Sequence, residues 1–175
     1  MQKGLIHVYY GYGKGKTTAA LGLALRAAGC GKKVVIVQFL KGTDTGELNC
    51  LKLLPNVTVL RGTAVNGFVN DMTPEQLEKT KQMQDSNLMK ALDIVSSDGC
   101  DLLVLDEALD ACQLGLLNAG LFSDFVFNKP EALELVITGH KPDDAIISRA
   151  DYVTEMVKIK HPYDKGIKAR KGVEF

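Results

Sequence analysis

The chain has 175 residues, 46% of them hydrophobic and 24% charged, which is enough for one domain with a buried core. Its 21 basic residues balance 21 acidic ones, so the composition gives no indication of binding to nucleic acid or to a membrane surface. No apolar segment reaches the roughly 18–20 residues of a membrane-spanning helix, and the four cysteines are widely spaced. We therefore expect a single domain over residues 1–175, in the reducing cytoplasm.

Apolar segments rich in β-branched residues alternate with segments of helical periodicity along the chain. The apolar segments predict strands at residues 5–10, 34–40, 57–60, 101–107, 134–139 and 152–157. The segments between them predict helices at residues 17–28, 74–97, 107–117 and 142–149. Because the strands are continuously apolar, both faces of the sheet are expected to be covered. The pattern predicts an α/β fold with a doubly wound, mainly parallel sheet and helices on both faces.

Two of the expected helices carry end signals. Gly29 follows the first helical segment and is the expected C-cap residue. Thr73 and Gln76 have the spacing of a capping box around Pro74, so the longest helix is expected to begin there.

Two glycine-rich stretches, residues 42–50 and 61–72, lack any periodicity. Each follows an expected strand, and ligands of doubly wound sheets bind beyond the carboxyl ends of the strands. The two stretches are therefore either borders of a binding site or plain connections.

The segment between the first expected strand and the first expected helix is rich in glycine and lysine. Here backbone N–H groups and the helix N-terminus attract phosphate, and glycine lets the backbone approach it closely. We predict that ATP is bound by Gly11, Tyr12, Gly13, Lys14, Gly15, Lys16, Thr17 and Thr18. Lys16 is expected to contact phosphate oxygens and the Thr17 hydroxyl to ligate Mg²⁺, while Lys14 adds a further positive charge.

The loop is one residue shorter than the usual phosphate-binding loop, G-x-x-x-x-G-K-[ST]. That pattern requires glycine where the chain has Tyr10, and the nearest glycine is Gly11. The short loop suggests that the triphosphate lies differently from its position in common NTPases. A glycine-rich turn without a ligand is the alternative, which the preceding strand and the following helix disfavour.

Asp106 and Glu107 end the expected strand 101–107. Hydrophobic residues followed by an acid are typical of the second half of a magnesium–nucleotide site, because that strand often lies beside the first. Glu107 is expected to bind Mg²⁺ directly or through water, and Asp106 to do the same or to hold Thr17. The alternative is that the acidic pair caps the next helix.

The residues alone predict a nucleotide-binding protein without naming the acceptor. The sequence indicates no nucleophilic serine or cysteine with a histidine partner. An ATP-dependent switch that hydrolyses slowly and holds a partner with its loops is one alternative. A small-molecule kinase is another, but the arginines are scattered rather than gathered in a lid, at Arg26, Arg61, Arg149 and Arg170.

Several segments point further: GYGKGKTTAALGLALRAAG, VVIVQFLKG with Gly46-Glu47, LLVLDE, ITG at 137–139, RADYVTEM at 149–156 and KHPYDKGIKARKGVEF at 160–175. Together they resemble the ATP:corrinoid adenosyltransferases of the phosphate-loop type, the enzymes that adenosylate cob(I)alamin. They cover most of the chain in the order of that family, and the short glycine loop is itself a family trait.

The resemblance implies a reaction in which reduced cobalt attacks the 5′ carbon of ATP and the whole triphosphate leaves. The substrates are then ATP and cob(I)alamin or another corrinoid, and Mg²⁺ is the cofactor. Lys16, Thr17 and Glu107 are the implied catalytic residues, and Thr17, Asp106 and Glu107 the implied metal ligands. A reductase that supplies electrons and a homodimer are further implications, with neither nucleic acid nor membrane as a partner.

The implied corrinoid contacts are Phe68, Lys41 and Glu47, although ordinary loop packing and solvated charges would explain the same residues. The sequence also departs from the family. Asn70 stands where a second aromatic residue is common after Phe68, and His140 stands where the family has arginine. The family often has an N-terminal extension that helps to cover the corrin, whereas this sequence starts almost at the first strand.

Overall fold

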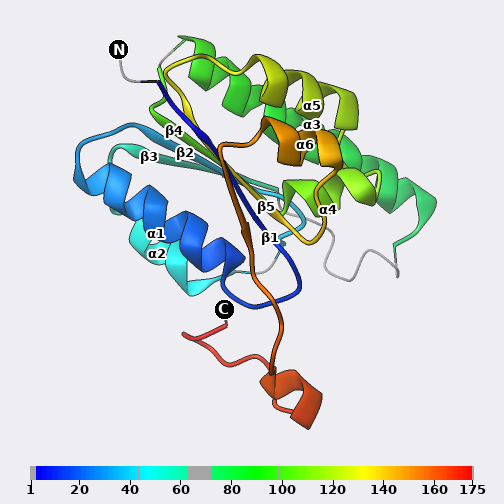
Figure 1. Ribbon diagram of the computed structural model, residues 1–175. Helices are drawn as coiled ribbons and strands as arrows, with labels where there is room; N and C mark the ends of the chain where they lie inside the picture. The colour runs from blue at the N-terminus through cyan, green and yellow to red at the C-terminus, as the bar shows by residue number, and fades with distance from the viewer. Residues whose placement is uncertain (1–2, 43, 63–71, 98, 175) are drawn as a thin grey trace.

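The computed structural model describes residues 3–42, 44–62, 72–97 and 99–174, which form a six-stranded sheet flanked by helices (Figure 1). The strands are β1 (Ile6–Tyr10), β2 (Val34–Gln38), β3 (Val57–Arg61), β4 (Leu102–Asp106), β5 (Glu134–Gly139) and β6 (Tyr152–Glu155). Their order is β3-β2-β4-β5-β1-β6, and every neighbouring pair is parallel. The parallel sheet is therefore confirmed, with strand ends within two residues of those predicted.

Helices cover both faces of this sheet, as the sequence predicted. They are α1 (Lys16–Gly29), α2 (Gly46–Leu51), α3 (Pro74–Ser97), α4 (Ala108–Gln113), α5 (Ala119–Asn128) and α6 (Asp144–Arg149). A short 3-10 helix, η2 (Pro162–Lys165), lies away from the sheet in the chain after β6 (Figure 1). Figure 1 shows α1 and α2 on one face and α3 to α6 on the other. No helix in the described part of the chain is long and apolar enough to span a membrane.

The core under α1 is built from small residues. Ala20, Ala24 and Ala27 lie one turn apart on one side of α1 and pack against buried valines and isoleucine of the sheet, among them Ile36 and Val104. Alanine favours the helix and lets its backbone approach the strands closely. This packing brings the first turn of α1 to the carboxyl end of the sheet.

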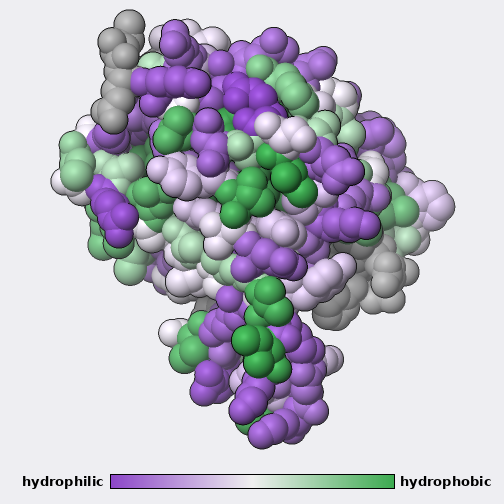
Figure 2. Space-filling model, viewed as in Figure 1, coloured by the Kyte–Doolittle hydropathy of each residue, from purple (hydrophilic) through white to green (hydrophobic). Residues whose placement is uncertain are grey.

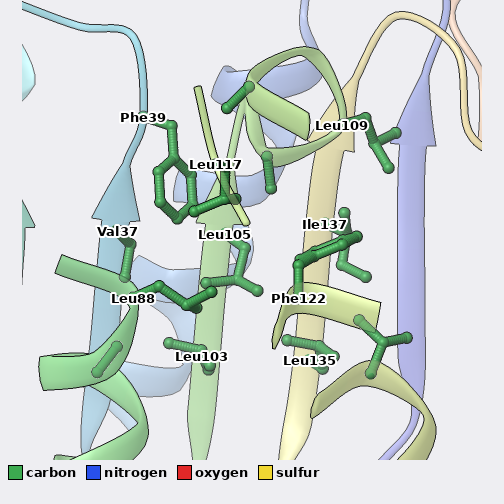
Figure 3. Packing of buried hydrophobic residues seen from close by; sticks show 14 of the residues in the cluster. Val37, Phe39, Leu88, Leu103, Leu105, Leu109, Leu117, Phe122, Leu135 and Ile137 are labelled. Atoms are coloured by element: carbon green, nitrogen blue, oxygen red, sulfur yellow. The ribbon is translucent and has the colours of Figure 1, made fainter. Parts of the chain in front are cut away.

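Larger side chains fill the opposite core (Figure 3). Leu105 of β4 lies beside Leu88 of α3, while Phe122 of α5 lies against Ile137 of β5; Phe39, just after β2, belongs to the same cluster. Burying a leucine or phenylalanine side chain contributes roughly 1.5–3 kcal/mol. This face therefore provides much of the stabilisation that holds the strand ends in place.

Three details of the predicted architecture are wrong. The Asp106 strand was expected beside the first strand, but β5 lies between β4 and β1. Residues 46–51 form α2 within a stretch expected to be irregular, and α5 was not predicted at all.

One of the two predicted helix ends is confirmed, and the other is displaced along the chain. Gly29 is the last residue of α1, but the C-cap is Cys30 and the left-handed glycine is Gly31, at φ 77°. Gly31 and Lys32 donate back to the last turn of α1, which is a Schellman motif. The capping box is confirmed by two reciprocal hydrogen bonds between Thr73 and Gln76, of 2.8 and 3.3 Å.

The chain beyond β6 leaves the body of the molecule. Residues 157–174 project below it in Figure 1, and Figure 2 shows hydrophobic and hydrophilic residues mixed over this extension. None of these residues is buried. We call residues 157–174 the C-terminal segment.

Candidate nucleotide site

Four neighbouring strands end in polar side chains on the sheet face that α1 covers. Gln38 of β2 pairs in register with Arg61 of β3 and with Asp106 of β4. Thr138 of β5 donates from Oγ1 to Asp106 Oδ1 over 2.7 Å. Gln38, Asp106 and Thr138 are all 0% exposed, so these polar groups are buried directly above the apolar core. A polar row at the carboxyl ends of parallel strands is where doubly wound proteins bind their ligands.

The glycine loop connects β1 to α1 beside this row. Gly11 and Gly15 have φ values of 106° and 117°, a left-handed region that other residues rarely adopt. Gly13 instead is required by space, because a Cβ there would lie 2.6 Å from the Met156 carbonyl oxygen. The Gly13 N–H donates to that same oxygen over 2.6 Å. The chain after β6 therefore crosses directly over the loop.

Lys16 folds back over the loop. Its Nζ donates to the carbonyl oxygens of Gly11 and Gly13, over 2.6 and 3.1 Å. Burial lowers the pKa of Lys16, an effect that Asp110, Glu107 and Asp106 partly oppose. These contacts place its ammonium group inside the concavity of the loop, where phosphate oxygens would lie.

The N-terminus of α1 is electrostatically open to an anion. Its N-cap residue, Gly15, has no side chain to bond the free N–H groups, and no acidic residue lies in the first turn. The free N–H groups and the helix dipole favour negative charge at this position.

Beneath the loop, one buried carboxylate gathers the polar side chains. Asp106 Oδ1 accepts from Thr17 Oγ1 over 2.9 Å as well as from Thr138. Asp106 Oδ2 accepts from Lys41 Nζ over 2.6 Å. Lys41 Nζ also donates to Thr17 Oγ1 over 3.0 Å and lies 3.5 Å from Glu107 Oε1. Thr17 of α1, Lys41 after β2, and Asp106 and Glu107 at the end of β4 thus come from three segments of the chain and meet at one point. We call these four residues the carboxylate cluster.

Backbone strain is concentrated beside this cluster. Leu40 and Glu107 have φ values of 57° and 62°, the only positive values among non-glycine residues in the described ranges. Such conformations cost roughly 1–3 kcal/mol and are found mainly at functional sites. The Glu107 N–H is held by Thr138 Oγ1 at 2.8 Å. Burial raises the pKa of the Glu107 carboxyl, Lys41 opposes this, and Asp106 and Asp110 reinforce it.

The donor atoms of the cluster fit Mg²⁺. The Thr17 hydroxyl and the Asp106 and Glu107 carboxylates offer only oxygen, which this hard cation prefers. No group of three or more histidine, cysteine or acidic residues suited to a metal occurs among the described residues. Mg²⁺ does not need one, because it usually takes one or two carboxylates and completes its shell with water and substrate phosphates.

Most of the predicted site residues that the structure describes meet at this place, and Tyr12, Lys14 and Glu47 lie around it. Tyr12 is 70% exposed, with its ring 5.0 Å from that of His140. Lys14 Nζ lies 3.1 Å from Glu174 Oε1 of the C-terminal segment. Glu47 of α2 lies further along the polar row, with Oε1 3.5 Å from Gln38 Nε2. Phe68 and Asn70 lie outside the described residues.

Sequence reasoning missed four residues that shape the site. Thr138 and Gln38 organise the polar row, and Gln38 Oε1 has no hydrogen-bond partner among the described residues. Asp110 holds His140 through both its ring, at 2.8 Å, and its backbone N–H. Met156 bonds to the loop. A polar residue ending an apolar strand was a usable signal for the first two, whereas the contacts of Asp110 and Met156 depend on tertiary structure.

Two of the four cysteines, Cys100 and Cys112, pack against the hydrophobic core. All four are free, and Cys30 and Cys50 are exposed. Burial raises the pKa of Cys100 to about 11 and that of Cys112 to about 12. Reactive cysteines have lowered pKa values, so these two partly buried thiols are poor nucleophiles.

The parallel sheet, the glycine loop at the start of α1 and the carboxylates beneath it define a protein of the phosphate-loop class. The family model of the ATP:corrinoid adenosyltransferases BtuR/CobO/CobP matches residues 2–175. The chain belongs to this family, whose members transfer the adenosyl group of ATP to a corrinoid.

Individual relatives agree. Corrinoid adenosyltransferases of Pseudomonas aeruginosa and Escherichia coli K12 are each 34% identical to 99% of this chain, which covers 85% and 87% of their lengths. The corrinoid adenosyltransferase of Salmonella typhimurium is 35% identical over 99% of the chain and 87% of its own length. Among solved structures, the EssC ATPase region of Geobacillus thermodenitrificans matches with a TM-score of 0.48 and 13% sequence identity. The match covers 97% of this chain and 35% of the EssC chain, and a likeness this distant carries no conclusion.

Proposed function

We propose that this protein transfers the 5′-deoxyadenosyl group of ATP to the reduced cobalt of cob(I)alamin or a precursor, and that its glycine loop and carboxylate cluster hold the departing triphosphate. The observation that carries the proposal is the meeting of Thr17, Lys16 and Asp106 at the open N-terminus of α1. Family membership supplies the reaction, and this geometry supports the assignment of residues.

The chemistry explains why the site is rich in cations. The cobalt electron pair forms a bond to C5′ of ATP while the C5′–O bond breaks, and the triphosphate leaves with the electron pair of the broken C5′–O bond. The corrinoid is the nucleophile, so the protein needs no general base. Its tasks are to hold the reacting atoms together, worth roughly 7–11 kcal/mol in favourable cases, and to stabilise the charge of the leaving group.

The loop residues share the second task. The N–H groups at the start of α1, with Lys14 and Lys16, would contact triphosphate oxygens. An ammonium group about 4 Å from a phosphate oxygen contributes on the order of 4 kcal/mol at an effective dielectric of 20. Mg²⁺ held by Thr17, Asp106 and Glu107 would add positive charge against the leaving group. The family resemblance implies an ATP that lies reversed in the loop, with its 5′ carbon toward the corrin.

Corrinoid binding is assigned to residues around the polar row. Glu47 and Phe68 remain our candidates, since both belong to the connections that follow β2 and β3. Lys41 is the third, but its ammonium group must first leave Asp106 and Thr17 in order to reach a corrinoid.

One assay tests the reaction. Protein is incubated with Mg-ATP and chemically reduced cob(I)alamin, and the phosphate product is identified together with the corrinoid. We expect inorganic triphosphate and adenosylated corrinoid in equal amounts. ADP or orthophosphate with unchanged corrinoid would overturn the proposal and favour the ATP-dependent switch.

Two variants separate the two substrates. Lys16→Ala should abolish ATP binding in calorimetry, because it removes the ammonium group from the loop, whereas Lys79→Ala on the exposed face of α3 should not change it. Phe68→Ala should bind ATP normally and lose corrinoid turnover. A fully active Phe68→Ala would contradict the corrinoid assignment.

The working environment is also a proposal. Family resemblance supports a homodimer in the cytoplasm that receives cob(I) from a reductase. Light scattering of the purified protein tests the dimer directly, and a single-chain mass would contradict it.

A further inference from the structure

The Lys41 side chain occupies the space between the expected metal ligands. Its Nζ lies 2.6 Å from Asp106 Oδ2, 3.0 Å from Thr17 Oγ1 and 3.5 Å from Glu107 Oε1. These are the same three groups whose oxygens would ligate Mg²⁺. A cation of the protein itself therefore stands where a metal cation would bind.

The backbone holds Lys41 in this place. Leu40 turns the chain after β2 through its left-handed conformation, at φ 57°. Arg61 Nε of the neighbouring strand donates to the Lys41 carbonyl oxygen over 3.4 Å. The Lys41 side chain is 18% exposed and that of Asp106 only 1%, so their attraction is little screened by water. Removing one partner of such a pair leaves an uncompensated buried charge.

No other described lysine takes this role. Lys16 Nζ donates to loop carbonyl oxygens, and Lys14 Nζ is directed to Glu174. Among the described lysines, Lys41 is thus the one whose ammonium group neutralises the carboxylate cluster.

We propose that Lys41 is a tethered cation that fills the magnesium position of the nucleotide-free protein and gives it up when Mg-ATP enters. An ammonium group and Mg²⁺ cannot share three oxygens at these distances, because their charges repel. Free Mg²⁺ would have to displace the Lys41 ammonium group without offering it a new anionic partner. Mg-ATP brings phosphate oxygens that give the displaced ammonium group a new partner, so the metal enters with the nucleotide. This inference rests on the metal ligands assigned under the proposed function.

Metal binding without nucleotide tests the idea, with Mn²⁺ as the probe and the electron paramagnetic resonance signal of free Mn²⁺ as the readout. We expect wild-type protein to bind Mn²⁺ weakly. Lys41→Met should bind it about tenfold more tightly, equivalent to about 1.4 kcal/mol. Lys41→Arg keeps a cation in place and should resemble the wild type.

The matched control is Lys79→Met, which makes the same change of net charge at a lysine paired with Glu75 on the surface of α3. Equal Mn²⁺ affinities of Lys41→Met and wild type would overturn the proposal. An equal gain in Lys79→Met would do so as well, since it would show an effect of net charge alone.

A second measurement needs no variant. When inorganic triphosphate is added, the wild-type protein and triphosphate together should bind Mn²⁺ much more tightly than the protein alone or triphosphate alone. Tight binding of Mn²⁺ to the wild-type protein without triphosphate would overturn the proposal even if Lys41→Met failed to fold. Neither measurement uses ATP or a corrinoid, so its result is independent of whether adenosyl transfer is observed.

Discussion

Thr138 is the uncharged residue on which the acidic pair of the site depends. Its hydroxyl donates to Asp106 and accepts from the Glu107 N–H, so one side chain fixes both the buried carboxylate and the strained residue that follows it. The side chain is fully buried, so water cannot replace either bond. At this scale, the geometry of the site rests on hydrogen bonds to a neutral group.

We predict that Thr138→Val, which keeps the shape but removes the hydroxyl, lowers the free energy of unfolding by about 1–3 kcal/mol. It should also weaken Mg-ATP binding, because Asp106 and Glu107 lose the group that orients them. Urea denaturation and calorimetric titration measure the two effects. Thr138→Ser keeps the hydroxyl and should retain nucleotide affinity; a loss of affinity equal to that of the valine variant would contradict this role.

Among the secondary-structure elements, α5 shows how a helix is started by one side chain. Asn118 precedes the helix, and its Oδ1 accepts from the Leu121 N–H over 3.0 Å. The Asn118 N–H in turn donates to Asp85 Oδ1 of α3 over 2.7 Å, which ties the start of α5 to the longest helix. The cap therefore stabilises both the helix and its position over the core.

Asn118→Ala should lower the stability by about 1 kcal/mol, the usual value of an N-cap. For a chain of this length, that corresponds to a melting temperature lower by about 2–4 °C. Asn118→Ser, which can still accept the bond, should lose much less. Differential scanning calorimetry of both variants makes the comparison, and equal losses would rule out capping as the cause.

The elements that sequence reasoning identified are those with a local pattern. β5 has the predicted bounds. The glycine loop was recognised because its residues are consecutive in the sequence. α2 spans six residues, too few for periodicity to appear. α5 did carry a signal, since Leu121, Phe122, Phe125 and Val126 recur on one helical face.

The strand order and the place of Lys41 could not be predicted locally. The position of β5 between β4 and β1 depends on long-range pairing. Lys41 reaches Asp106 because Leu40 adopts a left-handed conformation. Leucine rarely adopts this conformation, so a leucine in the sequence does not predict it. The site's composition and the contact between Thr17 and Asp106 were therefore predictable, whereas the place of Lys41 among these groups was not.

At the scale of the whole molecule, the body and the C-terminal segment differ in how they are held. The segment has no buried residue in positions 157–174, while the sheet and its helices enclose two continuous cores. Its contacts to the body include the pair of Glu174 with Lys14, which is exposed and contributes little.

Limited digestion with trypsin should therefore cut within residues 157–174 first, after exposed residues such as Lys158, Lys160 or Lys168. The remaining body should persist, because its backbone bonds lie in buried elements. Mass spectrometry of the earliest products identifies the cut. A first cut after Lys32 or Lys33, between α1 and β2, would show that the body opens before the segment does.

The position of β1 in the sheet has a consequence for folding during synthesis on the ribosome. The first strand to be synthesised lies between the last two, pairing with β5 on one edge and β6 on the other. Such distant partners make folding slow, since a long length of chain must close before they meet. A nascent chain that has already exposed its glycine loop must wait for nearly all its remaining residues to emerge. Until then, its earliest strand has two bare edges and depends on protection from aggregation.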